Sequence, residues 1–171
     1  MNAIYYSWAK IDEMVDELAG QITNSPVKIN HIYGVLRGGL IPSVLLSHKL
    51  SIPMTTSWLP NTLIVDDMVD SGSTLKTLKM NAILNNYLTP PSTAVLFRRH
   101  STGFEPDFYG ETIENDSWIV YPWENLDKTE SEYKTYKKKR ERVPIAEDAP
   151  KNFPRILPFI PQKSNLKPRT T

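Results

Sequence analysis

The spacing of apolar residues predicts a helix near the start of the chain. Between Ile11 and Ile22, apolar side chains recur every three or four residues, which places them on one face of a helix. Ser7 precedes this pattern and is a residue type favoured at helix N-caps. We therefore expect an amphipathic helix over residues 8–22.

Short apolar runs alternate with predicted helices from residue 29 to residue 121. Pro42 follows one of these runs, at a position where the first turn of a helix tolerates proline. The predicted strands are 29–36, 53–58, 62–66, 94–97 and 117–121, and the further helices are 42–49 and 73–85. This alternation favours an α/β fold, with a Rossmann-like parallel sheet flanked by helices.

The composition fits a globular protein with one core. The chain has 171 residues, 40% of them hydrophobic, which is enough for a single well-buried core. The absence of cysteine excludes disulfides, thiol catalysis and cysteine-bound metals, and it fits a reducing cytoplasm. The three histidines are scattered, and no apolar run is long enough to span a membrane. We expect a cytoplasmic protein with no membrane partner.

Charge divides the chain into two regions. Residues 127–171 contain twelve Lys or Arg against six Asp or Glu, whereas residues 1–126 carry a net charge of −5. An acidic body is not the electrostatic footprint of a nucleic-acid-binding domain, so we expect no nucleic-acid partner. We predict one domain over residues 1–126 and a basic, proline-rich tail over residues 127–171.

Two parts of this tail differ in pattern. The segment 128–142 is polar on all sides, which is typical of a solvated helix or a flexible segment. Prolines interrupt the remainder, where apolar residues gather between Phe153 and Ile160. These apolar residues suggest that part of the tail docks on the body or on another subunit.

Carboxylates and small hydroxyl residues follow the predicted strand 62–66. The strand stops at Asp66 and Asp67, and Asp70 then opens a short loop, Ser71-Gly72-Ser73-Thr74, ahead of a helix. Open α/β sheets bind ligands at the carboxyl ends of their strands. Backbone N–H groups of such a loop suit a phosphate, and the acids suit ribose hydroxyls or a hard divalent cation. The stretch therefore predicts a combined phosphate and sugar or metal site.

Two more segments add candidate binding groups. Arg37-Gly38-Gly39 follows the predicted strand 29–36, and paired glycines let backbone approach a phosphate closely. The segment from Asp116 to Glu124 contains two tryptophans, which are more often core residues than ligand platforms when considered alone.

Taken together, these motifs resemble those of the type I phosphoribosyltransferases. The acidic stretch resembles their signature for 5-phosphoribosyl 1-pyrophosphate (PRPP), and Arg37-Gly38-Gly39 resembles their pyrophosphate loop, where a cis peptide would fall at Leu36–Arg37. Trp118 and Ile119 resemble the base-binding pair of bacterial xanthine-guanine and archaeal purine enzymes. The resemblance covers roughly residues 4–126 and implies the phosphoribosyltransferase fold.

The resemblance also implies a role for each matching residue. Asp66 and Asp67 would hold the ribose hydroxyls and Mg²⁺, with Asp67 as the metal ligand, and Asp70 would manage the proton on purine N7. The implied phosphate-binding residues are Ser71, Gly72, Ser73 and Thr74 for the 5′-phosphate, and Leu36, Arg37, Gly38 and Gly39 for pyrophosphate. Trp118 and Ile119 together would stack on the base and offer main-chain carbonyls to its edge. The resemblance implies PRPP and a purine base as ligands, Mg²⁺ as cofactor and a homo-oligomer.

The sequence departs from the family at two places. Family members place a lysine opposite the 6-oxo group of the base, and the matching position here is Arg99. Arginine also donates hydrogen bonds to a carbonyl, but its shape differs. The family usually inserts a flexible hairpin, or hood, before the acidic motif, and here only Ile52 to Asn61 is present. We expect a shortened hood.

The leading hypothesis is therefore a purine-salvage transferase that joins a 6-oxopurine to PRPP, giving a nucleoside 5′-monophosphate and pyrophosphate. The alternative is a noncatalytic PRPP- or nucleotide-binding regulatory module of the same fold, because the family fold also serves regulators. A pyrimidine-specific transferase is a third option. The three aspartates and the Trp118–Ile119 pair favour the purine enzyme.

Overall fold

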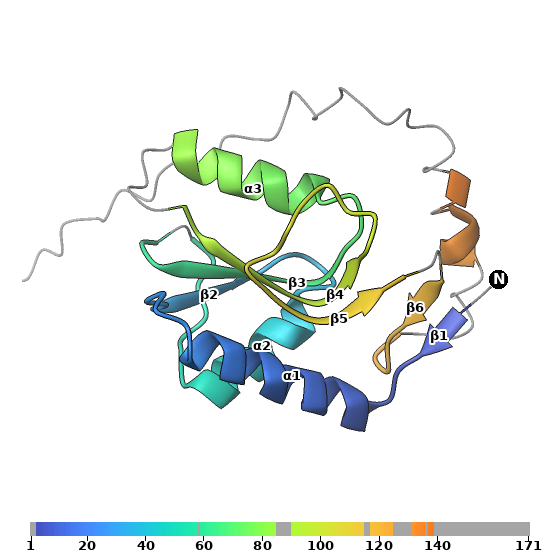
Figure 1. Cartoon of the computed structure of the whole chain (residues 1–171), viewed down its shortest axis with the longest axis horizontal. Coiled ribbons are helices and arrows are strands. Elements are labelled where there is room, and N and C mark those ends of the chain that lie inside the picture. The colour runs from blue at the N-terminus through green and yellow to red at the C-terminus, as the bar shows by residue number, and fades with distance from the viewer. Residues whose placement is uncertain are drawn as a thin grey trace, which may run out of the picture.

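A four-stranded parallel sheet forms the centre of the molecule. The computed structural model describes residues 3–57, 59–84, 90–114, 117–124, 131–135 and 137–138. The sheet has the order β2-β3-β4-β5 (Figure 1). Its strands are β2 (His31–Gly34), β3 (Thr62–Val69), β4 (Ser92–Arg99) and β5 (Phe108–Ile113). A separate parallel pair joins β1 (Ala3–Tyr5) to β6 (Trp118–Val120).

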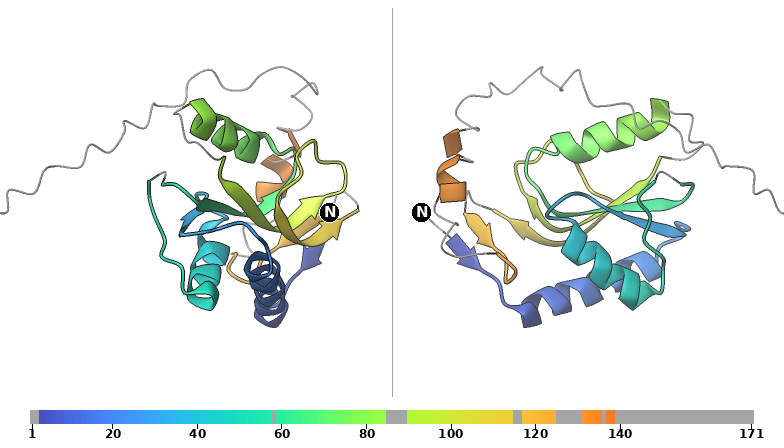
Figure 2. Two further views of the ribbon diagram at one scale, coloured as in Figure 1. Left: turned by 60° about the vertical axis from the view of Figure 1, so that its left-hand side comes forward. Right: turned by 180° about the vertical axis from the view of Figure 1, so that it is seen from behind.

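Helices cover both faces of the central sheet. Helices α1 (Trp8–Thr23) and α2 (Leu40–Leu50) lie on one face, and α3 (Ser73–Leu84) lies on the other (Figures 1 and 2). The side chain of Ser7 accepts a hydrogen bond from the Lys10 backbone N–H and caps α1, as predicted. The apolar face of α1 packs into a core with residues of β3 and β4. No helix among the described residues combines the length and the apolar character that crossing a membrane requires.

The structure confirms the predicted α/β class and the three predicted helices. It also places a strand within or across four of the five predicted ones: 29–36, 62–66, 94–97 and 117–121. The main difference in these four is β3, which continues to Val69 because Met68 and Val69 still pair with β4. Asp66 and Asp67 therefore lie within a strand rather than after one.

Three strand predictions were wrong or incomplete. Residues 53–58 form no strand in their described part, where Met54 makes only an isolated parallel bridge with Ile32. Strand β5 was missed, because its burial does not alternate along Phe108–Ile113 and gives no two-residue pattern. Strand β6 does not extend the central sheet but pairs with β1. The apolar tail residues 153–160 lie outside the described residues.

Candidate functional site

Asp66 and Asp67 lie side by side on β3, beneath the loop that follows β2. Asp66 is buried, with 9% of its surface exposed, and its carboxylate accepts a hydrogen bond from the Asp67 backbone N–H at 3.0 Å. The Asp66 and Asp67 side chains also interact with each other, so the two carboxylates form a close pair. The predicted acid pair is therefore real, but one of its members is almost enclosed by protein.

Burial disfavours the ionised form of both carboxylates. It raises the pKa of Asp66 to about 8, with the neighbouring charge of Asp67 adding to the shift. Burial also raises the pKa of Asp67, against the opposing effect of hydrogen bonds from Asp66 and nearby backbone N–H groups. A bound cation would favour the ionised form of both acids, because an opposite charge nearby offsets the cost of burial.

The Leu36–Gly39 loop lies directly on this acid pair. The Val35 backbone N–H donates to the Val65 carbonyl at 2.9 Å, which keeps the chain against β3 up to the loop. A Cβ built on Gly38 would overlap the Asp67 carboxylate, and one on Gly39 would overlap the Val65 carbonyl. Position 39 therefore requires glycine, because the overlap there is with backbone, whereas a larger residue at position 38 would displace the Asp67 side chain. The expected cis peptide bond between Leu36 and Arg37 is present.

Ser71 and Gly72 form the turn into α3, and Ser73 and Thr74 are the first two residues of that helix. Gly72 has φ +78°, a conformation that glycine adopts readily, and its carbonyl accepts a hydrogen bond from the Lys76 N–H at 2.9 Å. The Ser71 and Ser73 hydroxyls are 3.1 Å apart. The N–H groups of the first helical turn lack helical partners and carry partial positive charge. Sequence alone predicted a loop here, and the turn is present at that place.

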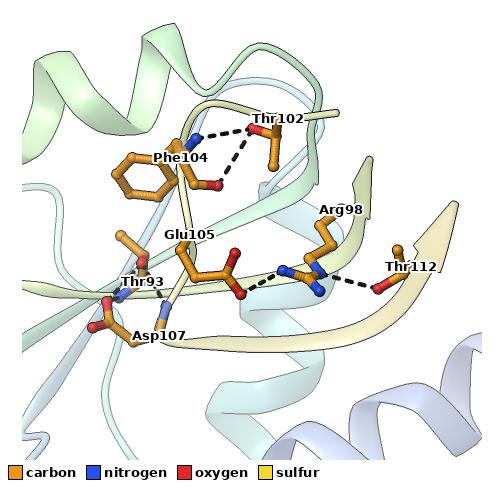
Figure 3. A network of polar contacts seen from close by, with 7 residues as sticks. All are labelled: Thr93, Arg98, Thr102, Phe104, Glu105, Asp107 and Thr112. Carbon is orange, nitrogen blue, oxygen red and sulfur yellow. Dashed lines mark hydrogen bonds and ion pairs between the residues drawn. The ribbon is translucent and has the colours of Figure 1, made fainter. Parts of the chain in front are cut away.

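The loop between β4 and β5 packs against that turn. A Cβ on Gly72 would overlap the Phe104 side chain, so Phe104 lies directly on the turn. Polar contacts hold the loop at both ends (Figure 3). Arg98 forms an ion pair with Glu105 and donates to Thr112, and Asp107 accepts from the backbone N–H of Thr93. Sequence analysis gave Phe104 no role, since its contact with Gly72 joins segments far apart in the chain.

Arg99 connects the acidic motif to β6. Its side chain is buried, its Nε lies 2.7 Å from Asp70 Oδ1, and its guanidinium donates to the Ser117 carbonyl at 2.9 Å. Ser117 immediately precedes Trp118. Two predicted site residues, Arg99 and Asp70, are thus in direct contact, beside the predicted base-binding strand.

Trp118 and Ile119 occupy different environments on β6. Trp118 is partly exposed, whereas Ile119 is 4% exposed and belongs to the core. The side chain of Trp118 is therefore the available platform, and Ile119 could contribute only backbone groups to a ligand.

Sequence analysis missed Tyr121, the residue after β6. Its ring stacks on Trp123 at 4.6 Å, and its buried hydroxyl has no hydrogen-bond partner of ordinary geometry among the described residues. Burial first, and then the charge of Asp67, raise the pKa of Tyr121 far above its usual value. The residue therefore stays neutral and lies close to the acid pair. No local motif marks it, because its neighbour Asp67 is distant in sequence.

The carboxylates of Asp66 and Asp67 suit Mg²⁺, which needs few protein ligands, better than a metal ion whose ligands all come from the protein. No group of three or more His, Asp or Glu residues in the described part of the chain is arranged to hold a metal ion. Magnesium typically binds one or two carboxylates and completes its shell with water and substrate phosphates. Asp66 and Asp67, next to a loop with close backbone approach, satisfy that requirement.

The fold and site define an α/β protein with an acidic strand and two glycine loops at one edge of a parallel sheet. Comparison with solved structures finds a purine phosphoribosyltransferase from Pyrococcus horikoshii with a TM-score of 0.64 and 31% identity, covering 74% of this chain and 97% of that chain. Xanthine-guanine phosphoribosyltransferases are similar in sequence. The one from Cereibacter sphaeroides is 28% identical over 119 residues, which are 54% of this chain and 68% of that protein.

A second such enzyme, from Idiomarina loihiensis, is 26% identical over 147 residues, covering 70% of this chain and 86% of that protein. No family model matches the chain. The similarity extends over nearly the whole length of the Pyrococcus enzyme. The chain therefore belongs to the type I phosphoribosyltransferase family. This is a family of transferases, and the three similar proteins named here are purine phosphoribosyltransferases.

Proposed function

We propose that this protein transfers the phosphoribosyl group of PRPP to a 6-oxopurine, namely guanine, hypoxanthine or xanthine. The observation that carries the proposal is the bridge made by Arg99, which contacts Asp70 and the carbonyl beside Trp118. This bridge supports a single site, because it joins Asp70 of the acidic motif to the strand that carries Trp118. A site that binds only a phosphate has no need for that connection.

In the proposed reaction, the ring nitrogen N9 of the purine bonds to C1 of the ribose as the bond to pyrophosphate breaks. Ser71 to Thr74 bind the 5′-phosphate through backbone N–H groups and hydroxyls. Leu36 to Gly39 bind the departing pyrophosphate, which carries away the electron pair of the broken bond. Fixing both ends of PRPP against the base supplies orientation, which is a large part of catalysis in such transfers.

The base is recognised by three residues in this scheme. Trp118 stacks on the purine ring, the Arg99 guanidinium faces the 6-oxo group, and Asp70 accepts the proton released from N7. A cationic donor complements a carbonyl oxygen and opposes the exocyclic amine of adenine. The scheme therefore favours 6-oxopurines over adenine.

Asp66 and Asp67 are proposed to hold the ribose hydroxyls and Mg²⁺, with Asp67 as the metal ligand. Magnesium bound there would neutralise charge on the pyrophosphate as it leaves. The raised pKa values of the two acids support this role, because buried carboxylates gain more from a cation than exposed ones do.

The second candidate function is a noncatalytic PRPP- or nucleotide-binding module. The short connection from Ile52 to Asn61 favours it, because a closing hairpin normally shields the reacting centre from water.

One assay separates the two functions. The full-length protein is incubated with PRPP, Mg²⁺ and each purine, and nucleotide and pyrophosphate are quantified together. Equal amounts of both products with a 6-oxopurine support the transferase. Nucleotide binding without either product supports the regulatory module.

Asp67→Asn and Asp12→Asn form a matched pair of variants for this assay. Asp67 adjoins the pyrophosphate loop, whereas Asp12 is an exposed residue of α1. Turnover should fall at least about 100-fold in Asp67→Asn, since metal-bound charge contributes several kcal/mol, and it should be unchanged in Asp12→Asn. Near-normal turnover in Asp67→Asn would refute the role of that residue.

A further inference from the structure

A residue from outside the family-like region contacts the proposed base platform. The ring of Tyr133 lies 5.8 Å from the ring of Trp118, centroid to centroid, at an angle of 74°. The short helical segment that carries Tyr133, drawn in orange, lies beside β6 in the views of Figures 1 and 2. Residues 131–135 and 137–138 are helical and mostly exposed, in line with the predicted solvated helix, but Tyr133 packs on Trp118.

Tyr133 differs from the residues around it. Its side chain is half-buried, whereas Glu132, Lys134 and Thr135 are exposed. The Lys137 ammonium lies 5.4 Å from the centre of the Tyr133 ring, a cation–π arrangement within the same segment. One aromatic ring thus anchors an otherwise polar segment, and it does so on Trp118.

A second observation places the segment beside the site. Burial is the main cause of the raised pKa of Glu124, and the charges of Glu132 and Asp67 add to it. Glu124 is therefore near both the segment and the acid pair. The backbone N–H of Tyr121 donates to Glu124 at 3.2 Å, which fixes this carboxylate at the end of β6.

The geometry of the two rings suits a corner rather than a stack. Two aromatic rings near a right angle offer a planar ligand one face to stack on and a second surface against its edge. Tyr133, on the segment after β6, presents its ring to Trp118 at such an angle.

We propose that Tyr133 is a positioning residue of the base subsite, whose ring forms the side wall of the purine pocket next to Trp118. This inference rests on the proposed function. It gives the beginning of the basic tail a role in holding the base, and it makes the pocket dependent on a segment outside the catalytic core of the fold.

The test compares Tyr133→Ala, Tyr133→Phe and Lys138→Ala in the full-length protein. Lys138 is an exposed residue of the same segment and serves as the control. Two quantities are measured for each variant: KM and kcat for guanine at saturating PRPP, and KM for PRPP at saturating guanine. Tyr133→Ala should raise KM for guanine about tenfold and leave KM for PRPP within about twofold, because edge contacts between aromatic rings carry a free energy of this order. Tyr133→Phe should restore the wild-type KM, since it keeps the ring.

An unchanged or lower KM for guanine in Tyr133→Ala would overturn the inference, as would an equal rise in both KM values. Titration of each protein with guanosine monophosphate separates this inference from the proposed function. Binding without turnover by the wild type contradicts the transferase, while the ratio of Kd values still tests Tyr133. No binding by the wild type overturns both.

Discussion

Gly38 lies against Asp67 so closely that any side chain at position 38 would occupy the space of the carboxylate. The Leu36–Gly39 loop and the acid pair are therefore in direct contact. Their relative position is set by the absence of a side chain at this one residue.

Gly38→Ala should impair PRPP use more than it impairs folding. Overpacking of this kind costs the fold roughly 1–3 kcal/mol. The added methyl group also displaces Asp67, and a misplacement of about 1 Å at a reacting group can lower kcat/KM for PRPP about 100-fold. Steady-state kinetics and thermal unfolding measure the two effects. Gly103→Ala is the matched control, because a Cβ at that position meets no atom within 4 Å. Equal behaviour of the two variants would contradict the importance of the Gly38 contact.

The buried acid pair predicts a dependence of stability on pH. An aspartate in the unfolded chain ionises near pH 4, whereas burial and the charge of Asp67 raise the pKa of Asp66 to about 8. Between these values the native state retains a proton that the unfolded state has released. The free energy of unfolding should therefore fall as pH rises from about 4 to about 8.

Urea denaturation at several pH values, without magnesium, measures this decline. Asp66→Asn should show a shallower decline than the wild type, because it removes the titrating group, and Asp12→Asn should keep the wild-type slope. Identical slopes in wild type and Asp66→Asn would show that Asp66 titrates normally.

The buried contact between Arg99 and Asp70 predicts energetic coupling. Arg99→Met leaves the Asp70 carboxylate without its guanidinium partner, so it should destabilise the protein more than the double variant Arg99→Met/Asp70→Asn does. A double-mutant cycle monitored by urea unfolding should give a coupling of roughly 1–3 kcal/mol. The exposed pair Lys10–Glu13 is the control and should show little coupling. Additive effects at Arg99 and Asp70 would indicate that their contact is weak in solution.

Phe104 should support the phosphate turn from the neighbouring loop. Phe104→Ala removes the ring but keeps the Cβ, which is the Phe104 atom nearest to Gly72. We expect KM for PRPP to rise about tenfold with a smaller change for the purine, since loss of the packed ring loosens the turn. Ile83→Ala, at an exposed apolar position of α3, is the control and should leave both KM values unchanged. A uniform loss of stability with normal KM values would assign Phe104 to packing alone.

The sequence predicted the parts of the structure that depend on local pattern. The N-cap at Ser7, the turn at Gly72 and the acids of β3 follow from residue types at short spacing, and each is present. The cis peptide at Leu36–Arg37 was expected from family resemblance and is also present.

Long-range contacts were not predictable in the same way. The pairing of β6 with β1, the position of Tyr121 near Asp67 and the contact between Tyr133 and Trp118 each join segments distant in sequence. Strand β5 was missed for another reason, because its central residues are partly exposed on both sides and lack alternation. The burial of Arg99 could not be predicted from sequence either, because charged residues are seldom buried unless they are paired, and its partners are distant in the chain.

The division of the strands into two sheets has a consequence for how the substrates meet. Asp66 and Asp67 lie on β3 of the central sheet and the Ser71–Gly72 turn follows that strand, whereas Trp118 belongs to the small sheet of β1 and β6. In the proposed reaction PRPP is thus bound at the central sheet and the purine at the small sheet. The Arg99 side chain links the two sheets through its contacts with Asp70 and Ser117. A shift of one sheet relative to the other would leave the affinity for each substrate unchanged but would misalign purine N9 with ribose C1. The alignment of the two sheets, rather than the affinity for either substrate, would then set the rate of transfer.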